Sequence, residues 1–178
     1  MRPRNILITG LPGCGKTTLV EKIVAQLNVP VRGFITRESR ERGNRVGFSI
    51  DTFDGQKEVL AHVNCKSRFR VGRYGVQIET IDRIAVPALK VISTDDVIIV
   101  DEIGKMECFS SLFRKAVLEL LDSPNLVLAT IAMKGDSFIQ SVKSREDVSV
   151  IELNQANRDV LVSSLLDSFC GGTAGKSH

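Results

Sequence analysis

The chain has 178 residues, of which 43% are hydrophobic and 25% charged, and this composition excludes a disordered, collagen-like or coiled-coil protein. The length fits a single domain, which we place at residues 1–170 with a β-rich insertion at about 32–64. A formal net charge of +3 is too small for the concentrated basic face that nucleic acid requires, so we expect no nucleic-acid partner.

The N-terminal segment indicates a cytoplasmic protein that does not enter a membrane. Residues 1–5 lead into Ile6-Leu7-Ile8-Thr9, an apolar run too short to cross a bilayer or to act as a signal core. Its β-branched residues and the glycine that follows predict a strand buried on both faces. The cysteines at positions 14, 65, 108 and 170 lack zinc-ligand spacing, so neither structural zinc nor disulfides are expected.

After the first predicted strand, a segment with helical spacing is followed by a β-rich segment. From Lys16 to Pro30 the apolar residues recur at helical intervals and predict a helix: Leu19, Ile23, Val24 and Leu27. Between residues 32 and 64, glycines separate short β-rich runs, which predicts antiparallel hairpins beside the main sheet. The run Lys66-Ser67-Arg68-Phe69-Arg70, with Arg73 beyond it, is a local basic exception, and a solvated loop is its simplest interpretation.

The rest of the chain alternates between helical and strand patterns. Helices are predicted over residues 79–92, 110–121, 138–142 and 155–169, and Pro87 should bend or start the first of them. Strands are predicted over residues 97–100, 126–131 and 148–153. This alternation indicates an α/β fold with a mostly parallel sheet and helices on both faces. Residues 171–178 are expected to form a disordered tail.

A phosphate-binding motif lies between the first strand and the first helix. The segment from Gly10 to Thr17 matches Gly-x-x-x-x-Gly-Lys-Thr, the P-loop or Walker A motif. Its glycines allow backbone N–H groups to surround phosphates, and the helix directs its positive end at them. Lys16 should reach the β- and γ-phosphates, and Thr17 should ligate Mg²⁺. The nucleotide-binding residues are therefore expected to be Gly10, Leu11, Pro12, Gly13, Cys14, Gly15, Lys16, Thr17 and Thr18.

An acidic pair ends the apolar strand at residues 97–100. Asp101 has the position of a Walker B aspartate that holds Mg²⁺, and Glu102 can polarise the attacking water. Strands that end at the same edge of a parallel sheet bring their carboxyl ends to one crevice, so the pair should lie beside the P-loop. The predicted catalytic residues are Lys16, Asp101 and Glu102.

Four motifs together resemble the THEP-type nucleoside-triphosphatases, which include the thermophilic and the cancer-related enzymes. The motifs are the segment 10–18, Gly33-Phe34-Ile35-Thr36-Arg37-Glu38, Val71-Gly72-Arg73-Tyr74-Gly75-Val76 and Asp101-Glu102-Ile103-Gly104-Lys105-Met106-Glu107. The similarity covers about residues 4–169. It implies a three-layer, RecA-like P-loop fold with a small antiparallel insertion, and Mg²⁺-dependent hydrolysis of ATP, GTP, CTP and UTP with low base selectivity.

The resemblance also implies secondary roles. Lys105 and Glu107 are expected near the γ-phosphate, and Arg73 and Arg158 are candidates for stabilising charge on the transferred phosphoryl group, although surface ion pairs explain both arginines equally well. We expect a monomer.

Two alternatives to a hydrolase are compatible with the same motifs. The chain could be a kinase that transfers the γ-phosphate to a small acceptor, with the β-rich section and residues 66–73 as a lid. It could also be a slow nucleotide-dependent switch whose loops bind a partner.

Overall fold

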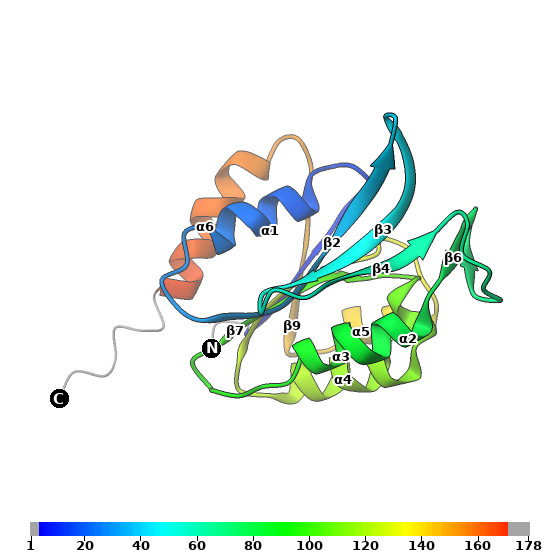
Figure 1. Ribbon diagram of the computed structural model, residues 1–178. Helices are drawn as coiled ribbons and strands as arrows, with labels where there is room; N and C mark the ends of the chain where they lie inside the picture. The colour runs from blue at the N-terminus through cyan, green and yellow to red at the C-terminus, as the bar shows by residue number, and fades with distance from the viewer. Residues whose placement is uncertain (1–3, 171–178) are drawn as a thin grey trace.

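Nine strands form one sheet in the computed structural model, which describes residues 4–170 (Figure 1). Their order across the sheet is β5-β6-β4-β3-β2-β7-β8-β1-β9. The strands are β1 Asn5–Thr9, β2 Val31–Glu41, β3 Asn44–Thr52, β4 Lys57–His62, β5 Arg70–Val71, β6 Tyr74–Val76, β7 Val97–Ile103, β8 Leu126–Ile131 and β9 Val148–Glu152. The strands expected near residues 6–9, 97–100, 126–131 and 148–153 are all present.

The parallel half of the sheet consists of β2, β7, β8, β1 and β9. The strands β7 and β8 are almost fully buried, because helices cover both of their faces. Strand β8 lies between β1 and β7. The carboxyl ends of these three strands therefore meet at one edge, as parallel strands require.

The antiparallel half continues the same sheet. The first part of β2 pairs with β7 in parallel, and its second part pairs with β3 in an antiparallel hairpin. Arg42 and Gly43 form the turn of that hairpin with positive φ angles of 47° and 81°. The sequence predicts these hairpins beside the main sheet, whereas in the structure β2 belongs to both halves. Phe34 and Ile35 give the reason, since both are buried in the central core.

Helices cover the two faces of the sheet, which gives the three layers that the sequence predicts (Figure 1). One face carries α1 Lys16–Val24 and α6 Arg158–Cys170. The other carries α2 Ile78–Thr80, the π-helical η1 Ile81–Ala85, α3 Val86–Ala88, α4 Ser111–Asp122 and α5 Ser137–Lys143, while the short helix η2 Glu107–Phe109 follows β7. Within the described part of the chain, no helix has both the length and the hydrophobicity that a bilayer span needs.

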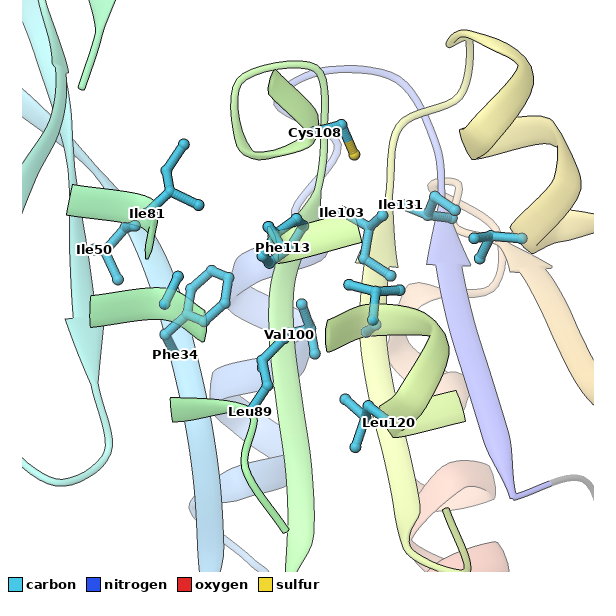
Figure 2. Packing of buried hydrophobic residues seen from close by; sticks show 14 of the residues in the cluster. Phe34, Ile50, Ile81, Leu89, Val100, Ile103, Cys108, Phe113, Leu120 and Ile131 are labelled. Atoms are coloured by element: carbon cyan, nitrogen blue, oxygen red, sulfur yellow. The ribbon is translucent and has the colours of Figure 1, made fainter. Parts of the chain in front are cut away.

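Alternating side chains divide the core into two clusters. In β1, Ile6 and Ile8 pack with α1 and α6, while Leu7 packs on the opposite face. Figure 2 shows the second face, where Phe34 from β2 and Phe113 from α4 approach with ring centroids 6.1 Å apart. These interlocking layers fix the position of the sheet edge at which β1, β7 and β8 end.

Three helix boundaries differ from those predicted. The first helix ends at Val24 rather than Leu27, and the next residues, up to Leu27, form hydrogen-bonded turns instead. The helical segment predicted over residues 79–92 covers 78–88, with a wide π turn before Pro87, which lacks an N–H donor. The last helix begins at Arg158 rather than near 155, because the Asn154 side chain accepts the N–H groups of residues 156 and 157. The predicted tail 171–178 lies outside the described residues.

Candidate active site

The P-loop connects β1 to α1 at the carboxyl edge of the sheet. Gly13 and Gly15 adopt positive φ angles of 75° and 99°, a conformation that a side chain would strain. Lys16 is the first residue of α1, and its Nζ donates hydrogen bonds to the carbonyl oxygens of Gly10 (3.1 Å) and Leu11 (3.3 Å). The ammonium group therefore lies over the loop, where it can meet an anion held by the loop amides.

Six of the nine predicted nucleotide-binding residues line the adjoining cleft: Pro12, Gly13, Gly15, Lys16, Thr17 and Thr18. Gly10, Leu11 and Cys14 do not line it. Gly10 is buried, and Leu11 points outward with 64% of its surface exposed. Cys14 packs against the core cluster of α1 and α6, so its side chain fills space beneath the loop. Sequence spacing identified the loop but could not separate the side chains that face the cleft from those that support it.

Asp101 joins the P-loop to the central strands. It ends the apolar part of β7, is only 2% exposed, and accepts a hydrogen bond from Thr17 Oγ1 at 2.7 Å. Thr130, at the end of the intervening strand β8, donates a hydrogen bond to the second carboxylate oxygen. Burial raises the pKa of Asp101, and the hydroxyl groups of Thr130 and Thr17 oppose that rise. The sequence analysis assigns no role to Thr130, because its contact with Asp101 depends on strand order.

Glu102 and Glu107 form a carboxyl pair beside Asp101. A Cβ atom on Gly104 would lie 2.6 Å from Glu102 Oε1 and 2.8 Å from Glu107 Oε2, so both side chains crowd this glycine. Burial raises the pKa of Glu102, and the Lys16 ammonium counteracts the rise. Burial, followed by the nearby charge of Glu102, raises the pKa of Glu107 to about 8. A proton on Glu107 near neutral pH relieves repulsion within the pair.

The oxygen atoms near the P-loop suit Mg²⁺. Thr17 and Asp101 supply a hydroxyl and a carboxylate in direct contact, and Mg²⁺ prefers such hard oxygen ligands. Residues 4–170 contain no group of three or more His, Cys, Asp or Glu side chains arranged for a metal. Mg²⁺ usually keeps several of its water ligands and also binds substrate phosphates, so it needs few ligands from the protein. The residues present therefore fit Mg²⁺.

The cleft extends well beyond the P-loop. It has a volume of about 650 Å³, and its far wall comes from β2, β3, β5 and the segment after β7: Thr36, Arg37, Glu38, Phe48, Val71 and Met106. Arg37 binds Glu21 of α1 at 2.6 Å and Asp51 of β3 at 3.2 Å, which links this wall to the helix of the P-loop. The Thr36 hydroxyl is buried and has no hydrogen-bond partner among the described residues. None of these six residues is a sequence-based site candidate, although all of them except Phe48 belong to the motifs quoted for the family resemblance.

The remaining candidates separate into two groups. Lys105 and Glu107 line the cleft together with Asp101 and Glu102. Arg73 and Arg158 do not line it. Arg73 lies over the Tyr74 ring and donates to the carbonyl oxygen of Arg45, and Arg158 lies at the start of α6, 3.8 Å from Asp159. Neither arginine reaches the P-loop in this conformation.

Comparison with known proteins gives consistent results. The family model described as NTPase matches residues 5–166. The chain is 44% identical to the nucleoside-triphosphatase THEP1 of Thermotoga sp. (strain RQ2), over 91% of this chain and 93% of that protein. It is 36% identical to the cancer-related nucleoside-triphosphatase of Homo sapiens, over 92% and 95% of the two chains.

Solved structures share the architecture over nearly the whole chain. The crystal structure of THEP1 from the hyperthermophile Aquifex aeolicus superposes with a TM-score of 0.85 at 38% identity, covering 93% of this chain and 98% of that one. The solution structure of a human cancer-related nucleoside triphosphatase gives a TM-score of 0.80 at 34% identity, covering 97% and 100%.

Proposed function

The chain belongs to the NTPase family, and on that basis we propose that its cleft binds a nucleoside triphosphate with Mg²⁺ and hydrolyses the bond to the γ-phosphate. The protein is thus a nucleoside-triphosphate phosphohydrolase. One observation carries the assignment to this cleft: the hydrogen bond of 2.7 Å between Thr17 and Asp101, which joins the P-loop to the acidic strand end. The P-loop and the carboxylate that we propose as the Mg²⁺ ligand therefore lie at one edge of the sheet.

Binding depends on the P-loop. Backbone N–H groups between Gly13 and Thr18 surround the β- and γ-phosphates at the positive end of α1. Lys16 exchanges its two carbonyl partners for phosphate oxygens, which are stronger acceptors because they are charged. Thr17 and Asp101 would hold Mg²⁺, which neutralises phosphate charge when bound. Thr130 keeps the Asp101 carboxylate oriented.

Hydrolysis depends on Glu102. Its carboxylate takes a proton from a water molecule whose oxygen attacks the γ-phosphorus, while the bond from that phosphorus to the bridging oxygen breaks and the diphosphate leaves. The raised pKa of Glu102 makes it a stronger base than an exposed glutamate. Lys105, beside it in the cleft, contributes positive charge near the γ-phosphate.

Low base selectivity is part of the same proposal. The groups assigned above contact the triphosphate tail, which ATP, GTP, CTP and UTP have in common. We therefore expect all four to be hydrolysed, with Mg²⁺ required for each. Phosphate and diphosphate release, measured for each nucleotide with Mg²⁺ present and then chelated, tests both expectations.

The decisive variant is Glu102→Gln. We expect it to bind nucleotide but to release phosphate about a hundredfold more slowly or worse, because the general base is lost. Glu146→Gln is the matched control, since Glu146 is exposed and lies outside the cleft. Full activity in Glu102→Gln would remove Glu102 from the mechanism, and absence of nucleotide binding in the wild-type protein would remove the proposal altogether.

A kinase is the second candidate, and the size of the cleft favours it. The wall formed by Thr36, Arg37 and Phe48 lies beyond the P-loop, and it presents the partly exposed Arg37 guanidinium and the Phe48 ring to a second molecule. The test supplies nucleoside triphosphate with a panel of small hydroxyl compounds. A phosphorylated product that forms faster than free phosphate would establish a kinase, and release of phosphate alone would exclude these acceptors.

A further inference from the structure

The positive charge of the chain is concentrated at one end of the molecule. Segments 38–45 and 64–73 contain seven basic side chains and two acidic ones, Glu38 and Glu41. Since the whole chain carries a net +3 and these segments carry +5, the remaining residues are net negative. We call this group the basic end, and its cations are Arg40, Arg42, Arg45, Lys66, Arg68, Arg70 and Arg73, all of them exposed.

The antiparallel half of the sheet brings the two segments together. A single row of paired residues crosses five strands, from Ser39 through Gly47, His62 and Gly75 to Arg70. At a strand spacing of about 4.8 Å, this row is about 19 Å long. The β2–β3 turn, the β4–β5 connection and the β5–β6 turn all lie beyond it. Figure 1 shows these loops at the end of the molecule opposite α6.

Glu38 pairs with Arg40 and Arg45, whereas the other five cations of the basic end have no counter-ion among the described residues. Arg42, Lys66, Arg68, Arg70 and Arg73 form no ion pair with any residue from 4 to 170. Three of these five guanidinium or ammonium groups have other contacts: Arg70 donates to the carbonyl oxygen of Arg73 at 2.7 Å, Arg68 lies 4.9 Å from the Phe69 ring centroid, and Arg73 lies over the Tyr74 ring. Exposed cations without counter-ions can bind phosphates.

The basic end also borders the cleft. Glu38 and Phe48 line the far wall of the cleft, and both contact Arg45, through an ion pair of 2.8 Å and a ring contact of 5.7 Å. Val71, which lies between Arg70 and Arg73 in the chain, lines the same wall. A polyanion on the basic end would therefore reach the mouth of the nucleotide cleft.

We propose that the basic end binds single-stranded nucleic acid along the three loops, with the strand passing the mouth of the cleft. Six of the seven cations are arginines, whose planar forks bind phosphates in pairs of hydrogen bonds and can stack on unpaired bases. A flexible single strand follows an uneven row of loops, whereas a rigid duplex touches only their tips. The sequence-based expectation against nucleic acid used the net charge of the whole chain, which averages the basic end with the acidic remainder.

The experiment compares two triple variants with the same change in charge. Arg42→Glu, Lys66→Glu and Arg68→Glu together alter the basic end at side chains that make no hydrogen bond or ion pair within residues 4–170. Lys22→Glu, Lys90→Glu and Lys115→Glu together alter exposed lysines elsewhere. Fluorescence anisotropy measures binding of a labelled RNA of about 20 nucleotides, longer than the site of a typical single-strand-binding domain. Phosphate release from nucleoside triphosphate and thermal unfolding are measured for each protein.

We expect the wild type to bind the RNA at about 50 mM salt and to lose affinity steeply as salt rises. The basic-end variant should bind at least about tenfold more weakly with a shallower salt dependence, and the lysine variant should stay within about twofold of the wild type. Phosphate release from nucleoside triphosphate, measured without RNA, should be the same in all three proteins. The proposal would be overturned if the wild type did not bind the RNA, if both variants lost affinity equally, or if a duplex or polyglutamate bound equally tightly. Failure of the hydrolase assignment would appear only in phosphate release.

Discussion

At the scale of single residues, Asp101 and Glu107 show how burial and hydrogen bonding control the carboxyl groups of the cleft. Asp101 has two hydroxyl donors, Thr17 and Thr130, which stabilise its charge against burial. Glu107 is 3% exposed and has acidic neighbours, so its neutral form is favoured. Burial raises the pKa of both carboxyl groups, but only Asp101 has side-chain hydroxyl donors that oppose the rise.

Thr130→Val removes one of the two donors to Asp101. Leaving a buried polar atom without one of its partners costs roughly 1–3 kcal/mol, so we expect the free energy of unfolding at pH 7 to fall by about that amount. Denaturant unfolding measures the change. Thr130→Ser keeps the hydroxyl and should recover most of the loss, and Thr94→Val, at an exposed loop position, is the matched control. Equal stabilities of Thr130→Val and Thr94→Val would contradict this role.

Glu107→Gln tests the raised pKa. The group titrates near 4.5 when exposed and at about 8 in the folded protein. The raised pKa stabilises the folded state fully below pH 4.5, and this stabilisation is lost as the pH rises through about 8. The free energy of unfolding of the wild type should therefore fall, relative to that of Glu107→Gln, between these two pH values. The loss should not exceed about 1.4 kcal/mol per pH unit.

Unfolding curves at several pH values measure this difference for Glu107→Gln. Glu119→Gln, at an exposed position of α4, should follow the wild type throughout. A constant difference between the wild type and Glu107→Gln from pH 5 to pH 8 would show that Glu107 does not titrate in this range.

At the scale of elements, the start of α4 is fixed by its N-cap residue, Ser110. The Ser110 side chain accepts a hydrogen bond from the N–H group of Phe113 at 3.0 Å and donates one to Asp82 of η1. The cap thus fixes both the start of α4 and its contact with the preceding helical segment. Phe113, which the cap positions, is fully buried against Phe34 of the central sheet.

Ser110→Ala should lower the free energy of unfolding by about 1–2 kcal/mol, since an N-cap and a buried hydrogen bond are both lost. Thermal or denaturant unfolding provides the measurement. Ser111→Ala is the neighbouring control, because Ser111 is exposed and lies inside the helix. If both variants were equally stable, the capping contact would have no energetic role.

At the scale of the whole molecule, strand order assembles the site. The P-loop follows β1, Asp101 ends the apolar part of β7, and β8 lies between them with Thr130 at its end. Strand β2 carries the far wall of the cleft and connects the parallel half to the antiparallel half. Because both walls belong to one sheet, a nucleotide bound between them should stabilise the entire fold.

A non-hydrolysable nucleoside triphosphate analogue with Mg²⁺ should therefore raise the unfolding temperature. With free ligand at about one hundred times its Kd, the expected gain is about 2.7 kcal/mol, or roughly 5–10 °C for a chain of this size. Chelating Mg²⁺ or substituting Lys16→Ala should remove most of the shift, which thermal unfolding monitors. A shift that persists unchanged after chelation would show that the metal does not take part in binding.

Local sequence determined the central features of this protein. The apolar runs of β1, β7 and β8, the P-loop from Gly10 to Thr17, and the acidic pair Asp101 and Glu102 could be predicted because each depends on neighbours in the chain. The shared edge of the parallel strands also predicted that the loop and the acidic pair would meet. Helix ends were less predictable, since the start of α6 depends on the hydrogen bonds of the Asn154 side chain.

Tertiary structure alone decided which side chains complete the site and where the charge gathers. Thr130 reaches Asp101 because β8 lies between β1 and β7, and Arg37 reaches the cleft because β2 joins both halves of the sheet. The cations near residues 42 and 70 form one surface because five strands, paired antiparallel, align their loops. These contacts join residues far apart in the chain, and their physical basis is strand pairing, which local sequence patterns do not encode.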